Sequence, residues 1–112
     1  MIDPNAFEDD DIFEASSLVS THTFRLKDIP PVKITVKIWQ GTESHGGHFF
    51  RYEISHAMHT PDQASPYHPS APYDRDEESI LRRAIRDFTF YLAGAKEAGH
   101  KPDVKWLIAN KP

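Results

Sequence analysis

Basic and aromatic side chains alternate with apolar ones along two segments in the middle of the chain, residues 32–39 and 49–58. Successive side chains of a β-strand point to opposite faces, so each segment is expected to bury its apolar set and expose the other. With a first strand at residues 17–27, the exposed face gathers Arg25, Lys27, Lys33, Lys37, Trp39, Phe49 and Arg51. Cations that neutralise phosphates, beside rings that stack on bases, are typical of a nucleic-acid-binding surface.

The same residues have a plainer interpretation. The lysines can be ordinary solvated side chains, with Trp39 and Phe49 covered by the N-terminal segment, the C-terminal segment or a second subunit. The sequence leaves these two interpretations open.

A second candidate interface lies on a predicted helix over residues 75–98. Its apolar residues form one stripe at helical spacing, made of Ile80, Leu81, Ala84, Ile85, Phe88, Tyr91, Leu92 and Ala95. Arg82, Arg83, Arg86 and Phe90 fall away from this stripe, and Phe90 stands roughly 150° from its centre at about 100° per residue. Aromatic residues and arginine are enriched at protein interfaces, so this face suits a partner or a second subunit. Alternatively, Phe90 lies along the arginine stems on a solvated face.

The histidines and the other reactive residues predict neither a metal site nor catalysis. His45 with His48 and His56 with His59 flank the third predicted strand, which would separate the two pairs by roughly 25 Å at about 3.3 Å per residue. The chain has no cysteine. It also lacks a glycine-rich phosphate loop and the GxSxG and HExxH motifs. We therefore expect a non-enzymatic protein without a metal or cofactor.

Composition and charge place further bounds on the protein. The chain has 112 residues, 38% of them hydrophobic, and a formal net charge of −4. Six of its 17 acidic residues and none of its 13 basic ones lie in residues 1–14, so the remainder carries a net charge of +2. We expect an acidic flexible tail at 1–14 and a single domain at 15–112. No apolar run approaches the roughly 18 residues of a membrane span, so a cytoplasmic protein is expected.

The elements that would position these residues are predicted from hydrophobic periodicity and from the positions of proline, glycine and capping residues. In the first strand Leu18, Phe24 and Leu26 are expected to face inward, and Pro30 and Pro31 to separate it from the second strand. A polar turn would join the second and third strands. Residues 60–73 form a proline-rich connection. Asp74 with Glu77 would form a capping box at the start of the helix, and Gly99 would end it. Residues 104–108 form a fourth strand or an irregular segment.

Together these elements predict an α+β fold. A three- or four-stranded antiparallel sheet would pack on one long C-terminal helix, in the order β-β-β-α. This order resembles that of plant AP2-type and integrase-arm DNA-binding domains, whose sheet face enters the major groove. No residue motif of either family is matched. The leading hypothesis is a non-catalytic module that binds a macromolecule, with nucleic acid as the candidate partner of the sheet face. The alternatives are a protein-interaction or inhibitor module, for which a homodimer is one form, and a small-ligand or metal-binding domain.

Overall fold

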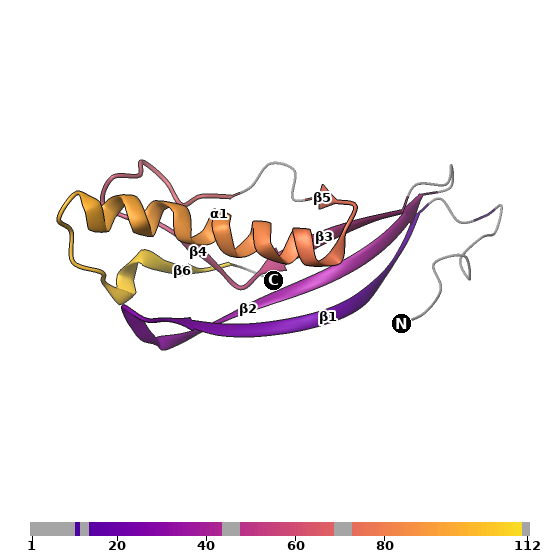
Figure 1. The fold of residues 1–112 in the computed structure, drawn as a ribbon, viewed down its shortest axis with the longest axis horizontal. Helices are drawn as coiled ribbons and strands as arrows, with labels where there is room; N and C mark the ends of the chain where they lie inside the picture. The colour runs from indigo at the N-terminus through magenta and orange to yellow at the C-terminus, as the bar shows by residue number, and fades with distance from the viewer. Residues whose placement is uncertain (1–10, 12–13, 44–47, 69–72, 111–112) are drawn as a thin grey trace.

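A computed structural model describes residues 11, 14–43, 48–68 and 73–110. Its main sheet is antiparallel and has the strand order β1-β2-β3-β5. The strands are β1 (Glu14–Leu26), β2 (Ile29–Glu43), β3 (His48–Ile54) and the two-residue β5 (Tyr73–Asp74). The helix α1 spans Glu77–Glu97, and a 3-10 turn at Val104–Trp106, η2, follows it. A second sheet pairs β4 (His56–Met58) with β6 (Leu107–Ala109). The predicted α+β fold, with its antiparallel sheet and one long helix, is confirmed (Figure 1).

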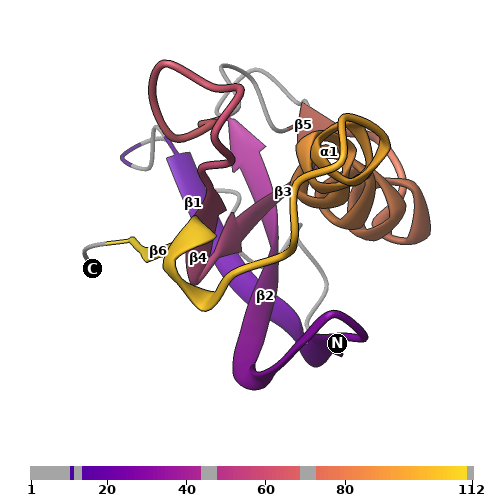
Figure 2. The same cartoon turned by 90° about the vertical axis from the view of Figure 1, so that its left-hand side faces the viewer.

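The helix lies along one face of the main sheet, which we call the inner face (Figures 1 and 2). Strand β2 turns Ile34, Val36 and Ile38 towards it, and all three side chains have no exposed surface. The β4–β6 sheet lies on the same side, because Met58 and Trp106 share a buried cluster with Ile34. Among the described elements none covers the other face, which we call the outer face.

The helix stripe that faces the sheet is close to the predicted one. The buried helix residues are Ile80, Ala84, Phe88, Leu92 and Ala95. Phe88 and Leu92 pack in the cluster of Ile34, while Ile80 and Ala84 pack with the part of the inner face around Val36 and Tyr52. Ile85, predicted to belong to the stripe, is 40% exposed. Spacing of three and four residues along α1 therefore predicted the buried face with an error at its margin.

The predicted helix end is confirmed, and the predicted start is wrong by two residues. Asp76, not Asp74, caps α1, because its carboxylate accepts from the backbone N–H of Ser79 at 2.8 Å. Ser79 Oγ also donates to this carboxylate at 2.8 Å, and the two hydrogen bonds hold the pKa of Asp76 below its ordinary value. At the other end Gly99 has φ of 91°, and His100 N donates to Ala95 O at 3.0 Å. This is the Schellman arrangement that glycine favours.

Two corrections concern the β1–β2 hairpin. Its register shifts between Leu18 and Ser20, so Val19 is an extra residue that reverses the faces of β1 before it. Leu18 consequently lies opposite Trp39 on the outer face and is 47% exposed, where an inward position was predicted. The prolines do not separate the strands either. Pairing runs from Ile29 with Leu26 directly to Ile34 with Phe24, which leaves Pro30 and Pro31 in a part of β2 outside the ladder.

The predicted third strand is divided in two at Ser55. Thr35 N donates to Ser55 Oγ at 2.9 Å, and Asn110 N donates to Ser55 O at 2.9 Å. Pairing with β2 therefore stops at the end of β3, and the next strand, β4, pairs with β6 instead. The segment predicted at 104–108 is a 3-10 turn followed by this short strand, β6.

Several predictions fall wholly or partly outside the described residues. The proposed flexible tail at 1–14 is one, although Glu14 already belongs to β1. The polar turn between the second and third strands was predicted at 40–47; residues 40–43 belong instead to β2, and residues 44–47 lie outside the described residues. Pro69 and Pro72 of the proline-rich connection also lie outside. Of the helices in the described ranges, none has the length and apolar character needed to cross a membrane.

Candidate binding surface

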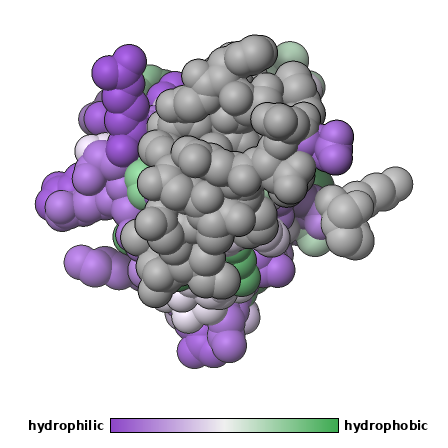
Figure 3. Space-filling view, turned by 90° about the vertical axis from the view of Figure 1, so that its right-hand side faces the viewer, coloured by the Kyte–Doolittle hydropathy of each residue, from purple (hydrophilic) through white to green (hydrophobic). Residues whose placement is uncertain are grey.

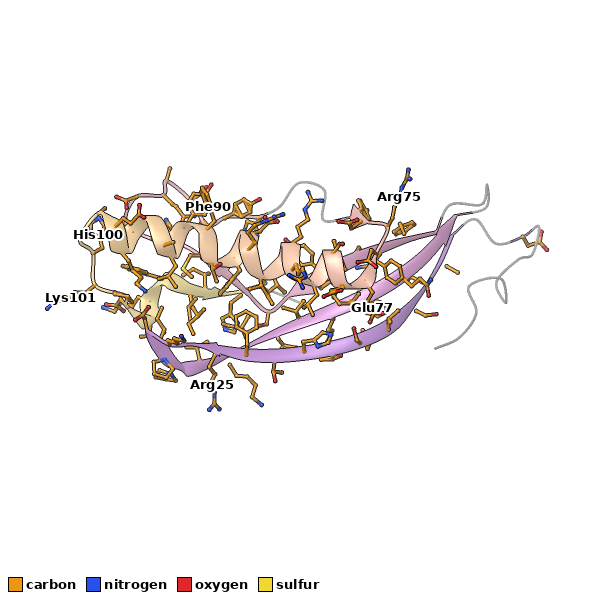
Figure 4. The ribbon with its side chains drawn as sticks, viewed as in Figure 1. Arg25, Arg75, Glu77, Phe90, His100 and Lys101 are labelled. Carbon is orange, nitrogen blue, oxygen red and sulfur yellow. The ribbon has the colours of Figure 1, made fainter. Side chains whose placement is uncertain are left out.

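Three cations project from one end of the outer face. Lys33 and Lys37 alternate with the buried residues of β2, and Arg25 follows Phe24, whose Cα pairs with that of Ile34. All three side chains are exposed, and Arg25 points away from α1 (Figure 4). Within the described residues none of them takes part in a salt bridge. We call these residues the basic end of the outer face. Their charges are therefore available to an anionic partner.

Lys27 does not belong to the basic end. Strand β1 finishes at Leu26, so Lys27 lies in the turn of the hairpin rather than on the sheet face. Its neighbour Asp28 accepts from Lys96 Nζ at 2.6 Å, which fastens the turn to the last helical turn of α1. Lys27 is nonetheless exposed and adds positive charge beside the basic end.

Trp39 and Arg51 pack against each other on the outer face. They are register partners, and the Arg51 guanidinium carbon lies 5.1 Å from the Trp39 ring centroid, within cation–π range. Arg51 Nη1 also donates to Glu53 Oε1 at 2.9 Å. Trp39 Nε1 is buried and has no hydrogen-bond partner among the described groups. One face of this ring is thus occupied within the protein, which limits the base stacking expected of it.

Phe49 lies directly over Gly41, its register partner on β2. A Cβ placed on Gly41 would come within 2.3 Å of Phe49 Cζ, so only glycine leaves room for the ring. Phe49 also contacts Tyr73, whose ring meets it edge to face with centroids 5.3 Å apart. Tyr73 is 52% exposed and is tied to α1 through its carbonyl, which accepts from Arg83 Nη1 at 3.0 Å.

These contacts make a continuous group at the other end of the outer face, which we call the aromatic end. Register places Leu18 opposite Trp39, Trp39 opposite Arg51, and Arg51 opposite Tyr73, so one row crosses all four strands. Phe49 completes the group. Viewed from the end where β1 begins, most described side chains in sight are hydrophilic and the apolar areas are small (Figure 3).

Sequence reasoning had identified Trp39, Phe49 and Arg51 but not Leu18 or Tyr73. Leu18 was missed because the bulge at Val19 has no clear sequence signal. Tyr73 was missed because β5 is a two-residue strand, and its position depends on pairing with Phe50 and Arg51. The period-two pattern that revealed the other residues needs a longer strand.

The second candidate interface separates into parts with different roles. Phe90 is 67% exposed and lies on the side of α1 turned away from the sheet (Figure 4). Arg86 is also exposed, and Arg82 pairs with Glu78 at 2.9 Å along the helix surface. Arg83 differs from these residues because its side chain contacts β5: it donates to Tyr73 O, and its Nε lies 3.9 Å from Asp87 Oδ2. Arg83 therefore fastens β5 to the helix.

An open hollow adjoins Phe90. It has a volume of about 480 Å³ and lies between α1 and the segment that follows β4. Its lining includes Arg86, Phe90, Asp62 and Thr60. Thr60 is almost fully buried, and its hydroxyl has no hydrogen-bond partner within the described residues. The hollow therefore offers an apolar wall with charges of both signs at its rim.

Partly buried polar groups beside the core make hydrogen bonds that stabilise the fold. Tyr52 Oη donates to Asp87 Oδ2 at 3.3 Å, and burial together with that carboxylate raises the pKa of Tyr52 above its usual value. Ser55 Oγ lies 2.7 Å from His56 Nδ1 and also accepts from Thr35 N. Because the serine oxygen is already fixed by a backbone donor, this pair fits a structural role at the bend better than a nucleophile and its base.

No group of three or more metal-ligating side chains lies together in the part of the chain that the structure describes. His59 is held by Gln63 O at 3.1 Å, and His22 by Ser20 Oγ at 3.0 Å. His45 lies outside the described residues.

Comparisons of the chain with protein-family models, with curated proteins and with solved structures found no significant match in any of the three.

Proposed function

We propose that this protein is a non-catalytic binding module that contacts nucleic acid through the outer face of its main sheet. The supporting observation is the basic end, where Arg25, Lys33 and Lys37 are exposed together on a sheet face that no described element covers. Each cation can neutralise one phosphate and release its counterions. The three project from two adjacent strands, so they can follow a phosphate backbone across the hairpin.

The aromatic end would play a different part from the one expected of Trp39. The Trp39 ring is stacked on Arg51, whereas the ring of Tyr73 is half-exposed. Tyr73 is therefore the better candidate for stacking on a base at the rim of the face. Trp39, Arg51 and Phe49 would form the support that holds Tyr73 in place, because Phe49 contacts it edge to face.

The test is a titration of labelled single- and double-stranded oligonucleotides with the protein at several salt concentrations. Affinity is expected to fall linearly with salt on logarithmic axes. The double variant Lys33→Ala with Lys37→Ala should lower the magnitude of that slope by about two. The matched control, Arg82→Ala with Lys101→Ala, removes the same charge elsewhere and should leave the slope unchanged. Absence of binding at low salt, or equal effects of both double variants, would contradict the proposal.

A second candidate function is recognition of a protein through the helix face around Phe90. The observation that favours it is the exposure of this large ring beside Arg86 and the hollow. A partner captured by the wild-type protein after nuclease treatment should be lost with Phe90→Ala bait. An identical set of captured proteins for the two baits would argue against this face.

A further inference from the structure

No described strand pairs with the outer edge of β1. Strand β1 is the first in the order β1-β2-β3-β5, and among the described residues its pairing partners all belong to β2. The strand has 13 residues, whereas β5 at the opposite edge of the sheet has two. An edge of this length presents a row of backbone donors and acceptors that can pair with another strand.

The edge lacks most of the features that prevent such pairing. From Ala15 to Phe24 the strand contains no charged residue and no proline, and it is rich in serine and threonine. Charged residues and proline are the common means by which edge strands avoid association. The bulge at Val19 is the one such device in this stretch, and it affects only the beginning of the strand.

We propose that β1 pairs antiparallel with β1 of a second copy of the chain, around a two-fold axis at His22. The register with β2 is regular over residues 20–24, between the two irregularities of the strand, and His22 is the centre of that stretch. The axis places Thr21 of each copy opposite Thr23 of the other. Both threonines are exposed on the outer face, and Thr–Thr pairs across strands are favourable.

The distribution of charge favours a second copy over an unrelated strand. The two Arg25 residues would be six positions apart, roughly 20 Å at about 3.4 Å per residue, which exceeds the Debye length of about 8 Å at physiological salt. With this axis Leu26, the last residue of β1, lies opposite Leu18 of the other copy, so Glu14 of that copy would extend past the end of the strand, towards the turn that carries Lys27. Symmetry repeats this match of opposite charges.

The dimer would have one continuous sheet built from the main sheets of both copies. Residues opposite each other in an antiparallel pair share a face, so the two outer faces would join into one surface and both helices would lie on the other side. The basic end would occur twice on that surface. The inference does not rest on the proposed function, but it would give such a module two linked contact sites.

The experiment measures the self-association of the full chain by sedimentation over a range of concentrations. The variant Thr21→Glu with Thr23→Glu would place like charges directly opposite each other in the dimer. The matched variant Thr21→Glu with Thr23→Lys would place opposite charges there. In the protomer Thr21 pairs with Lys37 and Thr23 with Thr35, so a glutamate at position 21 gains a favourable neighbour within the fold.

The wild type should form a concentration-dependent dimer, with a dissociation constant raised about tenfold in the Glu/Glu variant and not in the Glu/Lys variant. Circular dichroism verifies the fold of both. If the Glu/Glu variant does not fold, Thr21→Lys with Thr23→Lys provides the same like-charge contacts. A monomer at every concentration, or a dimer that both double variants leave unchanged, would overturn the proposal.

Discussion

The two faces of strand β2 differ completely although their residues alternate along one chain segment. Ile34, Val36 and Ile38 have no exposed surface, whereas Lys33 and Lys37 between them are exposed. The cause is the helix, which supplies an apolar stripe to the inner face and nothing to the outer one. Stability should therefore depend on the inner face, and binding on the outer face.

The outer face is itself divided. At the basic end the cations project into solvent without ion pairs among the described residues. At the aromatic end Trp39, Arg51, Phe49 and Tyr73 contact one another. Substitutions at the basic end should therefore have little effect on the fold, whereas substitutions at the aromatic end should disturb it. This division separates residues that would contact a ligand from residues that hold the surface in shape.

The largest expected effect is on the inner face. Phe88→Ala removes a buried ring from the cluster of Ile34 and Leu92 and should lower the free energy of unfolding by about 3–5 kcal/mol. The matched control is Phe90→Ala, two residues along the same helix, which should change it by no more than about 0.5 kcal/mol. Urea denaturation of both variants measures the difference. Equal losses would show that exposure does not separate the two helix faces.

A smaller effect is expected at the aromatic end. Gly41→Ala would force Phe49 off its position and should destabilise the protein by about 1–3 kcal/mol. Gly94→Ala is the control, because a Cβ there meets no atom within 4 Å and the residue lies in α1. It should stabilise the protein by about 0.5–1 kcal/mol. Thermal unfolding distinguishes the two signs, and a neutral Gly41→Ala would mean that the aromatic end adjusts freely.

The third effect depends on pH. Burial lowers the pKa of His56 below its ordinary value of 6.5, so the unfolded chain takes up a proton that the folded protein resists. The free energy of unfolding should therefore decrease as pH falls below about 6.5. His56→Gln should flatten this part of the profile, and His68→Gln, at an exposed position, is the control. A profile that His56→Gln leaves unaltered would exclude this contribution.

The smallest effect is expected from the acidic N-terminal residues. Removal of residues 1–10 eliminates Asp3, Glu8, Asp9 and Asp10, and no cation. Oligonucleotide binding at low salt should then become tighter, and the gain should disappear at high salt because the affected interaction is long-range. Weaker binding by the truncated protein would contradict an electrostatic role for these residues.

Sequence patterns determined those features that depend on residues close together along the chain. Alternation over β2 correctly separated Ile34, Val36 and Ile38 from Lys33 and Lys37. Helical spacing revealed Phe88 and Leu92, and Gly99 marked the helix end through its positive φ. Each depends on a period or a backbone conformation that a short segment specifies by itself.

Only the tertiary structure decided the features that depend on distant partners. Leu18 lies on the outer face because the register with β2 shifts at Val19, and Tyr73 joins that face because β5 pairs with β3. The bend at Ser55 depends on Thr35 and Asn110, which lie 20 and 55 residues away in sequence. Among the described strands the outer edge of β1 is free because β3 pairs with β2 and not with β1. A one-residue slip exchanges the faces of a strand, and only the partner strand fixes the register.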